Sequence, residues 1–473
     1  MTRNTEKSFS FNNSQEQSEV TISKGNFRRD EITFLDNCDM GNHTNLDMHS
    51  KTGSYSSLHR QFKKTDHEHF ISILIATYNE QKVIDCLMNS CAALTYNQNK
   101  FEIIVVDDSE DETFHILKIW QKKIQNLKVI HRNNRKGWKG GALNVAINNM
   151  HTKSSYALIV DADVILASCT LENFVSCFNR CNLKENIEVI QGYSAPIVYY
   201  DYINNSKPDT CDQAIGKPNW TAKAINFRLA KRNLIEFVAK DKLSLPVQIT
   251  GSLYMIRSEV IKLLGFSEDL AEDWELTLNL YCSPNRILPH VYNHKNRQHD
   301  SNIGTRKVIY YPSLRSYSGT ITKFRAYFRQ RMRVSEGHTR AFRKNIFNIL
   351  ISKIRLRDKI ELILTGLQYS KYIAAVTLII VDSILLSSNG IDFVISDDFM
   401  KMSLSVQAAI FSITIGICFM ALDVCTAIQS YDVRDVLYLF LLNLCTVPAF
   451  VIGSLYGYFK DQGIFYRTEK SND

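Results

Sequence analysis

Residues Ala157–Asp163 read Ala-Leu-Ile-Val-Asp-Ala-Asp, an apolar run that ends in two carboxylates separated by one residue. The apolar run predicts a buried strand, so the Asp-x-Asp pair follows the strand's carboxyl end. An earlier run, Phe101–Val106, is followed in the same way by Asp107 and Asp108. Ligands of parallel α/β sheets bind beyond the carboxyl ends of the strands, which is where these acids are expected.

Short apolar runs alternate with amphipathic segments on both sides of these two strands. Further strands are predicted at Ile71–Ile75, Leu127–Ile130 and Ile187–Ile190. Helices are predicted at Lys82–Leu94, Glu112–Gln125, Gly140–Asn149 and Leu171–Cys181. Strands that alternate with helices of this size predict an α/β fold with a parallel sheet covered on both faces.

Composition divides the chain into five segments. Residues 1–65 are polar and lack an apolar period, which predicts a disordered tail without a signal core. The α/β domain is predicted at 66–312, basic interfacial helices at 313–362, a membrane region at 363–460 and a C-terminal tail at 461–473. Three spans are predicted, at about 365–386, 404–426 and 436–459, because about 20 apolar residues cross ~30 Å of hydrocarbon.

The region before these spans is strongly basic. Lys323–Lys359 holds twelve Lys and Arg residues against Glu336 and Asp358, which predicts a cytoplasmic position by the positive-inside rule. Aromatic and basic residues mix through Phe324–Phe347, as in a helix lying on anionic lipid, although an ordinary solvated basic helix is an alternative. A lipid surface accounts for the formal charge of +8 without nucleic acid.

The eleven cysteines contain no C-x-x-C pair. This pattern favours reduced cysteines over a zinc site or a disulfide framework, and so a cytoplasmic main domain. Together with the basic segment and the spans, it predicts a multi-pass protein of the cell membrane.

Several polar motifs are candidates for chemistry. Asp161 and Asp163 offer hard oxygen ligands that could hold Mg²⁺ or Mn²⁺ against a diphosphate. Asp108 could accept hydrogen bonds from a nucleoside, and Lys139 lies among glycines where it could meet a phosphate or ribose, or simply belong to a basic turn. Neither motif is specific alone.

Two further motifs lie later in the chain. Glu272 and Asp273 open an amphipathic segment, where they could stabilise a helix N-terminus, or Asp273 could act as a general base. Gln330-Arg-Met-Arg333 places a planar guanidinium where it could pair with diphosphate oxygens or with a lipid surface.

Taken together, these motifs resemble the family 2 glycosyltransferases, whose fold is GT-A (Rossmann-like). The resemblance extends from Ile71 to His338, and the later motifs are most similar to the cellulose, chitin and hyaluronan synthase branch. The segments that carry it, in chain order, are Ile71–Glu80, Val105–Ser109, Gly137–Asn144, Asp161–Asp163, Gln191-Gly192, Thr250–Ser252, Glu272-Asp273 and Gln330–Arg333.

The resemblance implies a role for each matching residue. Asp273 would be the catalytic base, and Asp161 and Asp163 would bind the metal, Mg²⁺ or Mn²⁺. The nucleotide-sugar would be bound by Thr77, Asn79, Glu80, Asp108, Lys139, Asp161, Gln330 and Arg333. The acceptor would contact Thr250, Gly251, Ser252 and Glu272. Two departures from the family pattern are Ala76, in place of proline, and Val334, in place of the tryptophan that stacks on the acceptor sugar.

The function implied is a membrane-bound, inverting transfer of sugar from a UDP-sugar to an acceptor hydroxyl, here as a processive β-polysaccharide synthase. An alternative is single-sugar transfer to a membrane lipid, as in ceramide glucosyltransferases or dolichyl-phosphate sugar synthases, which Val334 and the small number of spans favour. A non-catalytic membrane subunit is a third interpretation, against which the intact acids argue. The expected partners are a UDP-sugar, a saccharide or lipid acceptor and the bilayer, without nucleic acid.

Overall fold

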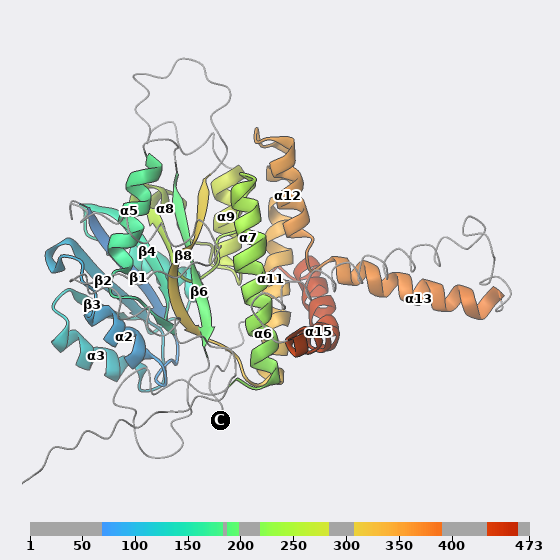
Figure 1. Cartoon of the computed structure of the whole chain (residues 1–473), viewed down its shortest axis with the longest axis horizontal. Coiled ribbons are helices and arrows are strands. Elements are labelled where there is room, and N and C mark those ends of the chain that lie inside the picture. Colours follow the sequence, from blue (N-terminus) through green and yellow to red (C-terminus); the bar gives the residue numbers. More distant parts are fainter. Residues whose placement is uncertain (1–68, 183–186, 198–217, 283–306, 390–432, 462–473) are drawn as a thin grey trace, which may run out of the picture. The chain divides into compact units, whose positions relative to one another are not determined.

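A computed structural model describes residues 69–182, 187–197, 218–282, 307–389 and 433–461 (Figure 1). The predicted disordered tail at 1–65, the span at 404–426 and most of the C-terminal tail lie outside these residues.

One eight-stranded sheet organises the α/β domain, in the order β3-β2-β1-β4-β7-β6-β8-β5 (Figure 1). Its first half is parallel and comprises β1 (Phe70–Thr77), β2 (Phe101–Asp107), β3 (Leu127–His131) and β4 (Ser154–Asp161). All four strands were predicted and are confirmed. Thr77 pairs with Asp107 and Ala76 with Asp161, so the carboxyl ends of β1, β2 and β4 lie level at one edge.

The second half of the sheet contains antiparallel pairs. β7 (Tyr254–Arg257) runs antiparallel to β4 and to β6 (Val189–Ile197). β8 (Val308–Gly319) runs parallel to β6 and antiparallel to the two-residue strand β5 (Val164–Ile165). The boundary expected between residues 312 and 313 falls inside β8, which stays in the sheet to Gly319.

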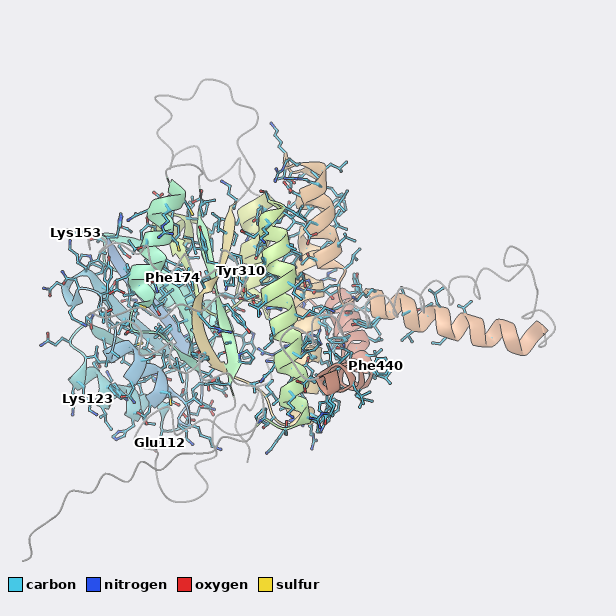
Figure 2. All side chains as sticks on the ribbon, in the orientation of Figure 1. Glu112, Lys123, Lys153, Phe174, Tyr310 and Phe440 are labelled. Atoms are coloured by element: carbon cyan, nitrogen blue, oxygen red, sulfur yellow. The ribbon has the colours of Figure 1, made fainter. Side chains whose placement is uncertain are left out.

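Helices bury apolar side chains on both faces of the sheet. The first core includes residues of α2 (Ile84–Ala92), α3 (Thr113–Lys123) and α5 (Thr170–Asn182); the second includes residues of α4 (Trp138–Asn148), α8 (Ser258–Leu264) and α9 (Glu272–Cys282). A 3₁₀ turn, η2 (Gln98–Lys100), precedes β2. Phe174 of the first core and Tyr310 of β8 in the second are labelled in Figure 2. The predicted helices and the covering of both faces are confirmed, but the expectation of a parallel sheet is wrong for its second half, where β7 runs antiparallel to β4 and β6.

A second helical group follows in the chain. α6 (Trp220–Lys231) continues through a π-helical turn, η4 (Arg232–Glu236), into α7 (Phe237–Lys242). The C-terminal helices are α11 (Phe324–Ile351), α12 (Leu356–Gly366), α13 (Lys371–Asn389) and α15 (Val433–Phe459). α11 was expected to lie on a lipid surface along its length, but its residues Ser335–Phe342 are buried because α15 and α9 pack against them.

The structure bears on two of the three predicted membrane spans. Among the described residues, one helical segment, Arg434–Phe459 with a mean hydropathy of 2.1, is long and apolar enough to cross a bilayer, and it coincides with the expected third span. Phe440 on this helix is exposed (Figure 2). Most of the expected first span, 365–386, lies in α13, which begins at Lys371, just after α12 ends at Gly366.

Candidate active site

The acids after β2 have different partners. Asp107 is buried and accepts hydrogen bonds from Thr77 Oγ1 (2.7 Å) and Ser109 Oγ (2.6 Å), and its other oxygen lies 2.8 Å from His131 Nδ1. These bonds join the ends of β1, β2 and β3. Thr77, expected at the nucleotide-sugar, therefore supports Asp107 with its hydroxyl.

Asp108 is held by a residue that sequence analysis missed. Arg132 donates from Nε to Asp108 Oδ1 (2.6 Å) and from Nη2 to Oδ2, so the guanidinium binds the carboxylate through both oxygens. Arg132 also donates to the carbonyls of Lys136 and Trp138, which fixes the loop that leads into α4. No spacing rule pairs residues 24 positions apart, so only the fold reveals this partner.

The loop after β1 is tied to the loop after β2. Asn79 has a φ of +56°, its backbone N–H donates to Ser109 Oγ (2.7 Å), and its side-chain oxygen accepts from the Glu110 N–H (2.8 Å). The Glu80 N–H donates to Thr113 Oγ1 (2.9 Å). These two residues, expected at the nucleotide-sugar, thus shape the loops at the carboxyl edge.

The start of α4 packs unusually close to the segment before α9. Gly137 has a φ of +74°, and a Cβ atom at Gly140 would lie 1.9 Å from the Ser267 carbonyl oxygen. Glycine is required where two backbones approach this closely. The contact brings Lys139, on α4, next to the acids of α9.

Lys139 joins three predicted motifs. Its Nζ lies 2.7 Å from Asp161 Oδ1 and 3.1 Å from Glu272 Oε1, and it donates to the Gly251 carbonyl (2.9 Å). Burial opposes the lysine charge, but Asp161 and Glu272 outweigh it and raise the pKa of Lys139 well above its usual value. The ammonium therefore stays charged and links the Asp-x-Asp end of β4 to the start of α9.

The Thr250–Ser252 loop lies against the same group. An added Cβ at Gly251 would lie 3.0 Å from Lys139 Nζ, 3.6 Å from Asp273 Oδ2 and 3.9 Å from Glu272 Oε1. Gln191, which belongs to a quoted motif but had no predicted role, orders this loop: its Nε2 donates to the Ser252 carbonyl (3.1 Å), and its Oε1 accepts from the Thr250 N–H (3.0 Å).

Asp273 has a strongly perturbed acidity. Burial and, second, the charge of Glu272 raise the pKa of Asp273 to about 6. Lys139, the Trp274 N–H and Arg232 act in the opposite direction. The Trp274 N–H donates to Asp273 Oδ1 at 2.8 Å, and the Trp274 ring stacks on His338 of α11, with centroids 4.7 Å apart. His338 is a contact that sequence analysis did not anticipate.

Arg333 of α11 belongs to the same electrostatic group. Its pKa is lowered to about 10, mainly by burial and also by the cations Arg331 and Arg135, while the carboxylates Glu272 and Asp273 act in the opposite direction. Gln330, expected beside Arg333 on the nucleotide-sugar, accepts a hydrogen bond from Arg331 Nη2 (2.8 Å). Arg135 lies over the Tyr78 ring, with 3.3 Å between guanidinium carbon and centroid.

The Asp-x-Asp pair departs from the geometry assumed for it. An extended segment would point both carboxylates the same way, but residues 162 and 163 form a turn after β4. Asp161 accepts from Lys139, whereas Asp163 Oδ2 accepts from the Gly319 N–H of β8 (2.9 Å). Among the described residues no three His, Cys, Asp or Glu side chains form a metal cluster.

The carboxylate oxygens of Asp161 and Asp163 are nevertheless the kind of ligand that a divalent cation such as Mg²⁺ prefers. Mg²⁺ is commonly bound by one or two carboxylates together with substrate phosphates and water, without an all-protein cage. The ammonium of Lys139 on Asp161 illustrates that this end of β4 accepts positive charge.

Comparison with known proteins defines the class of protein. Residues 72–196 match the model of Glycosyl transferase family 2. Over 113 residues the chain is 37% identical to beta-monoglucosyldiacylglycerol synthase of Trichormus variabilis, covering 24% of each chain. Over 103 residues it is 35% identical to poly(ribitol-phosphate) beta-N-acetylglucosaminyltransferase TarS of Staphylococcus aureus, covering 22% of this chain and 18% of that protein.

A solved structure extends the likeness to the fold. The mannosyltransferase PcManGT from Pyrobaculum calidifontis, determined in complex with GDP-Man and Mn²⁺, aligns with a TM-score of 0.50 and 17% identity over 84% of this chain and 90% of that one. Residues 72–196 are therefore similar to a family 2 glycosyltransferase domain, and the α/β fold is of the GT-A type. The chain spans about a quarter or less of the length of these curated relatives. They do not narrow the family to the cellulose, chitin and hyaluronan synthase branch.

Proposed function

We propose that this protein transfers a sugar from a UDP-sugar to the hydroxyl of a membrane lipid, with inversion at the anomeric carbon. The observation that carries the proposal is the grouping of Asp161, Lys139, Glu272, Gly251 and Asp273. It joins an end of β4 suited to a diphosphate to a carboxylate suited to remove a proton.

Asp273 acts as the general base. Its carboxylate takes the proton of the acceptor hydroxyl while the hydroxyl oxygen forms a bond to the anomeric carbon. The bond from that carbon to the diphosphate oxygen breaks, and the electron pair leaves with UDP. A pKa of about 6 leaves Asp273 ionised at neutral pH yet basic enough to accept the proton.

The donor is held from several sides. Asp161 and Asp163 would be the residues to hold Mg²⁺ or Mn²⁺, and the cation would supply positive charge to the diphosphate. Arg333 offers a guanidinium from α11 to the same phosphates, and Asp108, fixed by Arg132, offers its carboxylate edge to the nucleoside. The loops around the nucleotide are shaped by Thr77, Asn79 and Glu80. Gln330 accepts a hydrogen bond from Arg331, the residue that follows it.

A lipid acceptor is supported by two observations. The apolar helix α15 packs directly on α11, which carries Arg333: an added Cβ at Gly457 would lie 2.6 Å from the Glu336 carbonyl oxygen. A relative named beta-monoglucosyldiacylglycerol synthase supports a β-linkage and a lipid product. This placement makes the protein membrane-associated, with the catalytic domain on the cytoplasmic side that its basic segment predicts.

The test is product analysis with purified protein in vesicles. Labelled UDP-sugars are supplied with Mg²⁺ or Mn²⁺, and lipid-extractable product is separated from polymer. The proposal predicts single-sugar lipid product, its loss in EDTA, and its loss in Asp163→Asn. Polymer as the main product would favour a polysaccharide synthase, and full turnover in EDTA would refute the metal assignment.

A further inference from the structure

A second group of arginines lies beside the proposed active site. The basic cluster consists of Arg228 of α6, Arg232 of η4 and Arg331 of α11. Arg228 Nη1 donates to the Tyr327 hydroxyl (3.0 Å), and the Arg331 guanidinium lies 5.1 Å from the centroid of the same tyrosine ring. Tyr327 therefore connects two of the three arginines.

The third arginine is electrostatically close to the other two. Burial lowers the pKa of Arg232, and the charges of Arg331 and Arg228 lower it further. Glu236 acts in the opposite direction, but its carboxylate is paired with Lys240 at 2.6 Å. The three like charges are thus held together against their mutual repulsion.

No carboxylate pairs with these charges among the described residues, although nearby tyrosines raise the pKa of Arg228 despite its burial. Within the described parts of the chain, none of the three guanidinium groups forms an ion pair, and Arg232 makes no hydrogen bond. The Nε atoms of Arg232 and Arg331 are buried without a partner there. A desolvated cation without a counter-charge is costly, so its retention in a partly buried group indicates an anionic ligand.

The backbone at Arg232 is also irregular. Arg232 is the first residue of the π-helical turn that separates α6 from α7. Such π turns are rare, and where they interrupt an α-helix they frequently coincide with functional sites. The turn is independent evidence that this part of the helix is shaped for more than packing.

The cluster lies between the proposed base and the apolar helix. On one side, the charge of Arg232 lowers the pKa of Asp273, which requires the two groups to be near one another. On the other side, the Arg228 guanidinium lies 5.5 Å from the Phe450 ring centroid, and its Nη1 donates to Asn443 Oδ1 (3.4 Å), both on α15. An acceptor entering along α15 would meet the arginines before it reached Asp273.

We propose that Arg228, Arg232 and Arg331 bind the phosphate of the acceptor, a membrane lipid with a phosphate ester and a nucleophilic hydroxyl in one headgroup. Guanidinium groups bind phosphate oxygens through paired N–H donors, which would satisfy the buried Nε atoms. The inference rests on the proposed function. The phosphate keeps all its bonds during transfer, and only the headgroup hydroxyl loses its proton to Asp273.

The experiment compares two acceptors in phosphatidylcholine vesicles that contain the purified full chain. One acceptor is phosphatidylglycerol, with a phosphate and hydroxyls, and the other is diacylglycerol, with a hydroxyl but no phosphate. Wild type should glycosylate phosphatidylglycerol preferentially. Arg232→Gln should raise the KM for this lipid about tenfold or more, the range expected for losing hydrogen bonds to a charged group. Arg232→Lys should recover part of the loss.

Two controls separate this effect from general damage. Lys223→Gln on α6 and Arg329→Gln on α11 remove exposed cations from the same helices and should leave the KM unchanged. UDP affinity, measured by calorimetry, should be equal in wild type and Arg232→Gln, because the donor is bound by other residues. Equal effects of Arg232→Gln on both lipids, or no effect on either, would overturn the phosphate site.

Direct binding decides the matter even if neither lipid is glycosylated. Short-chain phosphatidylglycerol, titrated calorimetrically in detergent, should bind wild type and bind Arg232→Gln about tenfold more weakly. If glycerol phosphate bound as tightly as the lipid, the ligand would not be a lipid. If Arg232→Gln bound phosphatidylglycerol as tightly as wild type, the three arginines would not be the phosphate site. If wild type did not bind UDP, the proposed function would be wrong, but the lipid titration would still test the phosphate site.

Discussion

Asp273, the proposed general base, meets two requirements that usually conflict: little contact with water, and ionisation at neutral pH. Its carboxylate is shielded from water, and Lys139 and Arg232 lie close enough for their charges to limit the rise of its pKa to about 6. A carboxylate with this pKa is mainly ionised at neutral pH, yet it is a stronger base than an exposed aspartate. The balance depends on residues from α4, α9 and η4 together.

The role of Asp273 can be separated from helix capping. Asp273→Asn should lower turnover by about 10²–10⁴-fold, because asparagine caps a helix comparably but cannot accept the proton. UDP affinity, measured by calorimetry, should be retained. In wild type, kcat/KM should fall about tenfold per pH unit below an apparent pKa near 6, since the protonated acid is inactive. Unchanged turnover in Asp273→Asn would return the residue to a capping role.

Lys139 offers a second test at the residue scale. Its ammonium holds Asp161 and Glu272 and lowers the pKa of Asp273. Lys139→Met should therefore reduce turnover at least tenfold and move the acid limb of the pH profile to higher pH. The measurement is kcat/KM against pH, and Lys136→Met, which removes an exposed lysine nearby, should match wild type. An unshifted acid limb would mean that Lys139 does not tune the base.

The candidate site could be predicted from sequence only in its members, not in its pairings. Asp161, Lys139, Glu272 and Asp273 were each marked by their position after a strand or at a helix start. The contacts that Lys139 makes with these acids could not be predicted, because they depend on the close approach of Gly140 to Ser267. Arg132 and Gln191 had no local signal for their roles either, since each acts on a loop distant in sequence.

At the scale of elements, the packing of α15 on α11 is controlled by small residues. An added Cβ at Gly453 would lie 2.3 Å from the Met332 carbonyl oxygen, and one at Gly457 would lie 2.8 Å from Thr339 Cβ. Glycines one helical turn apart let two helix backbones approach closely, as in membrane helix pairs. α15 thereby holds the helix that carries Arg333.

Bulk at this contact should destabilise the protein. Gly457→Val should lower stability by about 1–3 kcal/mol, the usual range for forcing extra carbon atoms into a packed interface. Thermal unfolding in detergent, followed by intrinsic fluorescence, should show a lower Tm. Leu444→Val, at an exposed position of the same helix, should leave the Tm unchanged. Equal melting of Gly457→Val and wild type would mean that the two helices are not packed as described.

The elements predicted best are those with strong local patterns. β1, β2 and β4 are mainly apolar, and α2, α3 and α5 are clearly amphipathic. The π turn at Arg232–Glu236 has no comparable signal, because its residues are mixed and its shape is set by the helices around it. The first expected span, 365–386, lies mainly in α13, whose run of apolar residues begins just after Lys371.

At the scale of the whole molecule, apolar surface and positive charge are found together. The last turns of α11 and the helix α12 expose large apolar side chains, and α12 is flanked by basic residues. The exposed apolar residues are Phe347, Leu350, Ile351, Leu356, Ile360 and Leu364. Lys240 of α7 pairs with Glu361 at 2.9 Å and Arg355 donates to the Ser244 carbonyl (2.8 Å), which anchors α12 to the helices that follow Arg232.

The face of α12 is suited to lie in the surface of a bilayer. Leu356, Ile360 and Leu364 repeat every four residues, so they share one side of the helix, where they are 74%, 49% and 61% exposed. An apolar stripe beside basic residues is typical of helices that insert into the headgroup region. This arrangement would hold the acceptor side of the enzyme against the membrane independently of α15.

Replacing these three residues with serine should therefore reduce transfer to a lipid acceptor several-fold in vesicles. UDP release without acceptor should be unchanged, because the substituted side chains make no contact with the catalytic group. The measurement is initial rate against the density of acceptor lipid in the vesicle, and the loss should appear as a higher apparent KM. Lys353→Ser, an exposed cation between α11 and α12, tests whether charge alone would have the same effect. An equal loss of UDP release in the triple variant would show that α12 supports the fold, and an unchanged rate on vesicles would remove it from the membrane contact.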